Sequence, residues 1–376
     1  MNILVAIDSF KGSLSSIEAG NAVKTAALKL DKNACVTVKA LADGGEGTVE
    51  ALASGDGSEL VELSVSGPLL KPVSAKYCIL KETNTAVIEM ASAAGITLVS
   101  EKERNPLNTT TFGVGELIKD AVKRGCRRFI VGIGGSATND GGTGMLAALG
   151  FELLDQSGSP ISLGAKGLKT LKTIKTDKVL PELGECTFKI ACDVKNPLCG
   201  ENGCSAVFAP QKGATPEMIK EMDGWLKNFA EISKTVSKKA DENHPGVGAA
   251  GGLGFAFNTF LDSELKSGIE IVLDETGLEK DIMKADLVIT GEGRLDSQTV
   301  MGKAPIGVAR LAKKHGKKVI AFSGCATADA EVINDHGIDA FFPILREVTT
   351  LDEALNPETA QRNLTATAYQ VFRLIF

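Results

Sequence analysis

A strand–helix–strand pattern at the start of the chain limits the folds open to it. Asn2–Ile7 is an apolar, β-branched run that predicts a strand, and a second strand follows near Cys35–Leu41. Between them, Ser15 and Glu18 have the spacing of a capping box, and an amphipathic helix follows to about Leu30. Strands joined by a helix of this length pair in parallel through a right-handed crossover, so we expect a parallel sheet.

The C-terminal part repeats this alternation. Strands are predicted at Ala285–Thr290, Lys318–Ser323 and Ala340–Ile344, with a helix at Ala304–His315 and mostly helix over Leu351–Phe376. The strands are mostly apolar runs, which is typical of a sheet covered on both faces. We therefore expect the two chain ends to build one doubly wound domain.

The middle of the chain is less regular and predicts a second α/β domain inserted into the first. Its strand candidates are Thr85–Met90, Arg128–Ile133 and Phe188–Asp193. A length of 376 residues suggests two domains at about 150 residues each. We place the first domain at 1–68 and 285–376 and the inserted domain at 69–284.

Charge and hydropathy exclude several partners. The net charge is −6 and no basic stripe is present, so we expect no nucleic acid partner. The longest uncharged stretch, Asn243–Leu261, is too polar and too rich in glycine to span a bilayer, although Gly248 and Gly252 form a GxxxG match. We read it as a Gly-rich turn that leads into a buried helix. The N-terminus lacks the pattern of a signal peptide, so we expect a soluble cytoplasmic protein.

Four of the eight cysteines fall within Cys186–Cys204. No CxxC pair is present, whereas structural zinc sites usually pair ligands two to four residues apart. The cluster therefore resembles a metal site only weakly, and free thiols in a reducing compartment are the simpler interpretation.

The segment Gly132–Gly144 carries the richest chemistry. Six of its thirteen residues are glycine, and Ser136, Thr138 and Thr143 add hydroxyl groups. Small residues between a strand and a helix let backbone N–H groups approach phosphate oxygens, so the segment predicts an anion site. A tight structural turn is the alternative.

Other phosphate-binding signatures are absent or partial. Gly302-Lys303 is followed by Ala304, so it is not a Walker A motif, and the protein-kinase signatures are missing. Gly132–Ala137 fits the GxGxxA form of a dinucleotide fingerprint, with Asp155 closing the next strand-like run. An NAD-dependent oxidoreductase acting on a small hydroxy acid therefore stays open, as does a non-catalytic sensor of small acids.

Two basic residues and three acids stand near predicted strand ends, where open parallel sheets bind ligands. Lys11 suits a phosphate or carboxylate, or is a solvated loop lysine. Arg294 suits a substrate carboxylate, or forms an ion pair with Asp296 or Glu292. The acids are Asp43, Asp193 and Asp296, and such groups hold Mg²⁺ or accept a hydroxyl proton in phosphoryl transfer. Capping of a turn is the alternative reading of Asp193.

Taken together, these segments resemble the type I glycerate kinase family. The likeness covers essentially the whole chain in order, and it rests on Asp8-Ser9-Phe10-Lys11-Gly12-Ser13-Leu14, Ala42-Asp43-Gly44-Gly45-Glu46-Gly47-Thr48, Gly134-Gly135-Ser136-Ala137-Thr138-Asn139-Asp140-Gly141-Gly142, Cys192-Asp193-Val194 with Asn196-Pro197-Leu198, Gly248-Ala249-Ala250-Gly251-Gly252 and Gly291-Glu292-Gly293-Arg294-Leu295-Asp296. Lys195 departs from the variable or acidic residue expected in that family.

The resemblance implies a flavodoxin-like (Rossmann-like) parallel-sheet domain, discontinuous in sequence, plus the inserted α/β domain. It also implies ATP, Mg²⁺ and D-glycerate as ligands, with 2-phosphoglycerate favoured over 3-phosphoglycerate as the product. A homodimer is left open.

From their shared placement at strand ends we assign roles to individual residues. Lys11 would neutralise the transferring charge, and Asp193 would act as the base or metal ligand with Asp296 as its rival. Arg294, Ser13 and Asp43 are expected to bind substrate. The residues expected to hold the phosphates of ATP are Gly134, Gly135, Ser136, Thr138, Gly141 and Gly142.

Overall fold

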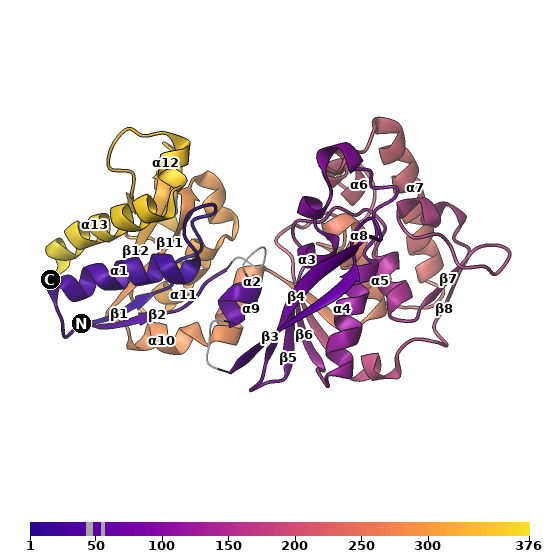
Figure 1. Cartoon of the computed structure of the whole chain (residues 1–376), viewed down its shortest axis with the longest axis horizontal. Helices are drawn as coiled ribbons and strands as arrows, with labels where there is room; N and C mark the ends of the chain where they lie inside the picture. The colour runs from indigo at the N-terminus through magenta and orange to yellow at the C-terminus, as the bar shows by residue number, and fades with distance from the viewer. Residues whose placement is uncertain (43–47, 54–56) are drawn as a thin grey trace. The chain divides into compact units, whose positions relative to one another are not determined.

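The protein has an α/β fold built on two sheets with parallel strands (Figure 1). The computed structural model describes residues 1–42, 48–53 and 57–376. Contacts between residues divide the chain into two compact units. The first unit contains residues 1–42 and 269–376, and the second unit contains residues 57–268. These units differ from the boundaries placed at 68 and 284 in the sequence, which stay a prediction.

The sheet of the first unit is entirely parallel and has the order β13-β12-β11-β1-β2. Numbered along the chain, this is the flavodoxin-like order 2-1-3-4-5, which reverses direction between β1 and β11. The strands are β1 (Asn2–Val5), β2 (Cys35–Val38), β11 (Leu287–Leu295), β12 (Lys318–Ala326) and β13 (Ala340–Pro343).

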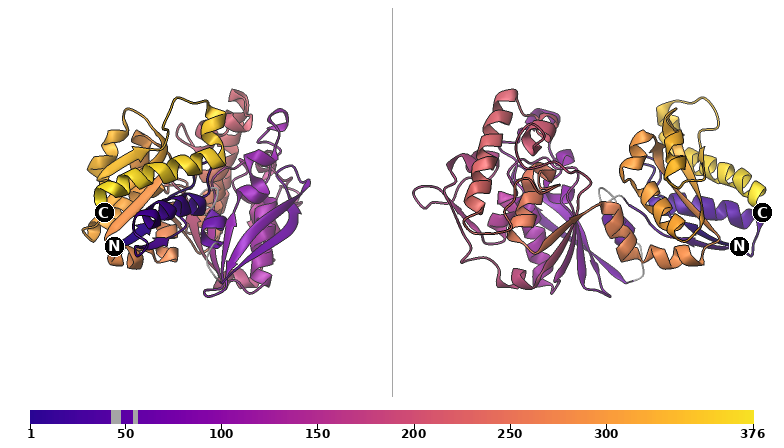
Figure 2. Two further views of the ribbon diagram at one scale, coloured as in Figure 1. Left: turned by 60° about the vertical axis from the view of Figure 1, so that its left-hand side comes forward. Right: turned by 180° about the vertical axis from the view of Figure 1, so that it is seen from behind.

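Helices cover both faces of this sheet. Figure 2 shows α1 and α13 side by side on one face, and α10 and α11 pack on the other. The side chains of β1 alternate between the two faces of the sheet. Ile3 and Val5 pack in the hydrophobic cluster under α1 and α13, and Leu4 packs in the cluster under α10 and α11. The helices of this unit are α1 (Ser16–Leu30), α9 (Gly268–Thr276), α10 (Leu278–Lys284), α11 (Ala304–Lys314), α12 (Leu351–Leu355), α13 (Pro357–Ile375) and the 3₁₀ helices η6 (Ser297–Met301) and η7 (Ala330–His336).

The predicted capping box at the start of α1 is confirmed. The hydroxyl of Ser15 accepts from the backbone N–H of Glu18, and the Glu18 carboxylate accepts from that of Ser15. These bonds satisfy two donors that a helix start leaves open. The short helix α2 (Thr48–Ala53) follows later in the chain.

The sheet of the second unit is mixed, with the order β10-β9-β6-β5-β4-β3. The first four are parallel, and the last two join through antiparallel pairing. The strands are β3 (Ser58–Ser66), β4 (Pro72–Leu80), β5 (Thr85–Glu89), β6 (Arg128–Gly132), β9 (Thr187–Ala191) and β10 (Ser263–Lys266), with a separate antiparallel pair β7 (Glu152–Leu154) and β8 (Thr173–Lys175).

Aromatic rings fill the core of the second unit, where Phe129 of β6 stacks on Phe188 of β9 with ring centroids 4.6 Å apart. Its α-helices are α3 (Ala91–Ala94), α4 (Phe112–Lys123), α5 (Thr143–Ala148), α6 (Cys204–Phe208), α7 (Pro216–Ser233) and α8 (Ala249–Phe260). Its 3₁₀ helices are η1 (Ile96–Leu98), η2 (Glu101–Glu103), η3 (Ala165–Thr170), η4 (Pro181–Glu185) and η5 (Pro210–Lys212).

The uncharged stretch forms a Gly-rich turn and a buried helix, as predicted. Ala250, Gly251 and Gly252 have φ values of 53°, 66° and 89°, so α8 begins with a left-handed turn before its regular, buried part. In the described part of the chain, no helix is long and apolar enough to cross a membrane.

Candidate active site

The carboxyl ends of β1 and β11 meet where the strand order of the first unit reverses, which is where open parallel sheets bind ligands. Lys11 follows β1 and is exposed. Ser13 lies in the same turn, and its hydroxyl donates to the carbonyl of Phe10 at 2.9 Å. A Cβ on Gly293 of β11 would lie 3.4 Å from the backbone nitrogen of Lys11, so the two segments are in contact.

Strand β11 is longer than predicted, and this changes the setting of Arg294. The strand continues through Gly291 to Leu295, so Glu292 and Arg294 lie within it rather than in a following loop. Asp296 then caps the 3₁₀ helix η6, where its carboxylate accepts from the backbone N–H of Gln298 at 3.0 Å. Strand geometry places Glu292 and Arg294 on one side of the chain.

A charged cluster forms at this strand end. Arg294 Nε lies 3.5 Å from Asp296 Oδ2, which is the ion pair considered as an alternative from the sequence. Lys303 Nζ lies 3.4 Å from Asp296 Oδ1 and 3.7 Å from Glu292 Oε1. The hydroxyl of Thr299 also donates to Glu292 at 2.7 Å. The Arg294 side chain is 63% exposed, so it stays accessible to a ligand.

Two members of this cluster were missed from the sequence. Lys303 appeared there only as part of an absent Walker A motif, and Glu292 only as a partner for Arg294 and a member of a family motif, without a role of its own. The signal for Lys303 was its place before Ala304 at the start of α11, because residues that begin a helix after a parallel strand lie at the ligand edge of the sheet.

In the second unit, the glycine segment leaves β6 with its backbone donors open. Gly134 and Gly135 are exposed, and Ser136 is 9% exposed. Gly135 has a φ of 73°, and its carbonyl accepts from the backbone N–H of Ile96 at 2.8 Å. Across the described residues, the N–H groups of Gly134, Gly135 and Ser136 have no protein acceptor. Successive free N–H donors around a left-handed glycine are the backbone pattern that binds anions in other proteins.

The rest of the segment is buried around the carboxylate of Asp140. That carboxylate accepts from the backbone N–H groups of Thr111, Gly142 and Gly144 at 2.8, 3.1 and 3.3 Å, and from the hydroxyls of Thr110 and Thr111. Burial raises the pKa of Asp140, and these donors oppose that shift.

This burial bears on the later residues of the predicted phosphate loop. Thr138, Gly141 and Gly142 are buried, and the Gly141 N–H donates to the carbonyl of Gly251. Helix α5, which begins at Thr143, is only six residues long. The later residues of the segment therefore pack inside the unit, and phosphate binding by any of the six predicted residues stays a prediction.

Two of the predicted acids remain. Asp193 follows β9, is exposed, and accepts from the backbone N–H of Gly268 at 3.1 Å. Asp43 lies outside the described residues. All eight cysteines are free thiols, and no group of three or more metal-ligating side chains occurs among the residues that the structure describes.

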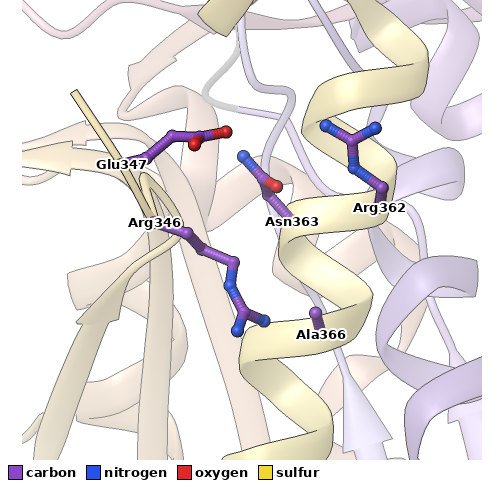
Figure 3. A pocket seen from close by; sticks show the side chains of 5 residues that line it. All are labelled: Arg346, Glu347, Arg362, Asn363 and Ala366. Atoms are coloured by element: carbon purple, nitrogen blue, oxygen red, sulfur yellow. The ribbon is translucent and has the colours of Figure 1, made fainter. Parts of the chain in front are cut away.

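A pocket of about 430 Å³ lies in the first unit between the segment after β13 and helix α13 (Figure 3). Arg346 and Glu347 line it from the segment, and Arg362, Asn363 and Ala366 line it from α13. None of the residues predicted from the sequence lines this pocket, and no member of the charged cluster around Asp296 lines it either.

The fold and these groups define an α/β enzyme with sites suited to anionic substrates. Residues 3–376 match the model of the Glycerate kinase family, and the chain belongs to this family. The type of enzyme predicted from the sequence, a kinase that phosphorylates an alcohol group, is thereby confirmed.

Individual members of the family are similar to this chain along almost their whole length. The chain is 47% identical to the glycerate 2-kinase of Escherichia coli K12, covering 98% of each chain. It is 46% identical to the glycerate kinase of Haemophilus influenzae, covering 100% of this chain and 99% of the relative. A crystal structure described as a glycerate kinase 2 of Salmonella typhimurium LT2 superimposes with a TM-score of 0.92 at 44% identity, covering 100% and 98%. The oxidoreductase alternative finds no support here.

Proposed function

We propose that the chain transfers the γ-phosphoryl group of ATP to D-glycerate, with 2-phosphoglycerate as the product. The observation that carries phosphoryl transfer is the run of three free N–H donors at Gly134, Gly135 and Ser136. Such donors suit phosphate oxygens. The choice of the C2 hydroxyl follows the relative named glycerate 2-kinase.

Glycerate is assigned to the first unit. A guanidinium group grips a carboxylate through two parallel hydrogen bonds, and the exposed side chain of Arg294 offers one. Lys11, whose backbone lies against Gly293, is proposed to supply positive charge for the transferring group, and Ser13 has a hydroxyl in the same turn. Asp43 completes the proposed substrate set as a prediction from the sequence.

The acid that accepts the proton of the glycerate hydroxyl is proposed to be Asp193 or Asp296. Asp296 is supported by its place beside Arg294, the proposed carboxylate ligand, at the strand-order switch. Asp193 is supported by its exposed position directly after β9. Either carboxylate would work by orienting the hydroxyl and taking its proton.

Mg²⁺ is proposed as the cofactor. Proteins usually bind this ion through one or two carboxylates plus substrate phosphates. Glu292 and Asp296, both held by Lys303, fit that donor set, and Asp193 fits as a single ligand. When bound, the ion neutralises charge on the phosphates of ATP.

The cytoplasm is the proposed location, because eight free cysteines suit a reducing compartment. A homodimer is proposed as the assembly to test.

The proposed function is tested by measuring ADP release with Mg-ATP in the presence and absence of D-glycerate. Release that depends on D-glycerate supports the assignment. A matched reaction with NAD⁺ replacing ATP tests the oxidoreductase directly, and NADH formation there would contradict the kinase.

A further inference from the structure

A buried lysine stands directly behind the glycine segment. Lys212 ends the 3₁₀ helix η5 and is only 2% exposed. Its ammonium group donates to the hydroxyl of Ser136 and to the carbonyl of Thr138, both at 2.7 Å. Lys212 is more than seventy residues from Ser136 and Thr138 in the sequence, so only the folded structure brings them into contact.

Among the described residues, Lys212 has no carboxylate in direct contact, although Asp140 acts on its charge from further away. Across the part of the chain that the structure describes, no carboxylate oxygen lies within salt-bridge distance of its ammonium group. The carboxylate of Asp140 is already occupied by donors from Thr111, Gly142 and Gly144. A buried charge without a partner is costly, so such a charge is normally compensated when the site is in use.

An anion bound to the free N–H groups of the segment would supply a compensating negative charge. The three N–H groups belong to Gly134, Gly135 and Ser136, and the ammonium group of Lys212 is bonded to the side chain of Ser136, so backbone donors and a positive charge occur on one short segment. An anion bound to those N–H groups would gain from the buried charge, because the interior between them screens it less than water does.

We propose that Lys212 is a positioning residue of the phosphate site: it fixes Ser136 and the Thr138 carbonyl, and its charge makes Gly134–Ser136 selective for a polyphosphate. This inference rests on the proposed function only in naming ATP as the polyphosphate. The contact with the phosphate itself is made by the backbone of the segment, and Lys212 acts through Ser136.

The charge state of Lys212 gives the proposal a pH signature. Burial lowers the pKa of Lys212 to about 8, while Asp140 and Cys204 act in the opposite direction. The pKa of Cys204 is itself raised to about 12 by burial, so its thiol stays neutral at working pH. Lys212 is therefore charged below pH 8 and loses its charge as the pH rises through 8, and affinity for the polyphosphate falls over the same range.

The experiment compares wild type with Lys212→Met and Lys212→Arg, and uses Lys220→Met as a control because Lys220 is an exposed lysine in the same unit. The dissociation constant for inorganic tripolyphosphate is measured by calorimetry at pH 7 and pH 9, and the KM values for ATP and D-glycerate are measured alongside. We expect Lys212→Met to weaken tripolyphosphate binding and raise the KM for ATP at least tenfold, with the KM for D-glycerate within twofold.

The ionisation of tripolyphosphate also changes between pH 7 and pH 9, but it changes equally for all variants. A difference in pH dependence between variants therefore reports on the charge of Lys212. Wild type should lose affinity relative to Lys212→Arg between pH 7 and pH 9, because the guanidinium stays charged. Equal pH dependence in the two proteins would overturn the proposal, and so would a folded Lys212→Met that binds tripolyphosphate as wild type does. If Lys212→Met does not fold, the comparison of wild type with Lys212→Arg still decides. If tripolyphosphate binding depends on Lys212 but the protein does not phosphorylate glycerate, the proposed function is contradicted and the inference about Lys212 is supported.

Discussion

The ammonium group of Lys303 lies 3.4 Å from Oδ1 of Asp296 and also reaches Glu292 at 3.7 Å. One cation thus holds two carboxylates at the point where the strand order reverses. Without it, the carboxylates of Glu292 in β11 and Asp296 directly after β11 would repel each other. The cluster therefore supplies acids in a fixed position beside Arg294.

Asp296→Asn should lower kcat by about 10²–10⁴-fold, the usual contribution of a positioned general base or acid. Asparagine caps a helix as well as aspartate does, so the 3₁₀ helix after it should persist and the protein should stay folded. Steady-state kinetics check the loss, and Asp335→Asn, an exposed acid in the same unit, serves as the control. Near-normal turnover would remove Asp296 from the mechanism and leave Asp193 as the acid.

Asp193→Asn is the companion test. The amide oxygen can still accept from the Gly268 N–H, so the local fold should be kept. We expect a loss of kcat of the same order if Asp193 takes the proton. A variant with unchanged kcat and unchanged dependence on Mg²⁺ would exclude it from both of its proposed roles.

Arg294→Lys should raise the KM for D-glycerate about tenfold or more and leave the KM for ATP almost unchanged. The reason is geometric: a lysine keeps the charge but cannot form two parallel hydrogen bonds to a carboxylate. Initial-rate measurements with each substrate varied in turn separate the two constants. Equal changes in both would argue that Arg294 acts on the fold of the strand end instead.

Asp140→Asn should destabilise the second unit by about 2–4 kcal/mol, because an amide nitrogen would face backbone donors that now bind a carboxylate oxygen. The midpoint of urea unfolding measures the change. Asp155→Asn, at an exposed turn, is the matched control and should shift the midpoint far less. Unchanged stability of Asp140→Asn would contradict the role of Asp140 in holding the segment.

Gly251→Ala and Gly224→Ala should have opposite effects on stability. Gly251 has a φ of 66° and a Cβ there would overlap the carbonyl oxygen of Thr138, so we expect a loss of at least about 2 kcal/mol. Gly224 lies inside α7 in open space, so alanine should gain about 0.5–1 kcal/mol there. Thermal unfolding of both variants checks the pair, and a stable Gly251→Ala would show that α8 tolerates a different start.

Local pattern was enough to predict the parallel strands and helices of the first unit, because their apolar runs and the Ser15–Glu18 cap are continuous in sequence. Local pattern did not predict that β11 continues through Gly291–Leu295, because the polar and glycine residues of this segment do not show the apolar run of a buried strand. The hairpin of β3 and β4 was also missed, although Val61, Leu63 and Val65 alternate as an edge strand requires.

The site was predictable only in part, for the same reason. Glycines after a strand pointed to the anion segment, and anion binding there stays a prediction, supported by the free N–H groups of Gly134, Gly135 and Ser136. The packing of Asp140 and the presence of Lys212 could not be predicted, because their partners are distant in sequence and no local period connects them.

The phosphorus NMR spectrum of the pure protein with Mg-ATP and D-glycerate tests the proposed reaction directly. We expect a new phosphomonoester signal that appears as ATP is consumed, coupled to the single proton on C2 of glycerate. Coupling to two protons would place the phosphate on C3 and contradict the proposed product, and ATP left intact would contradict the glycerate kinase assignment itself.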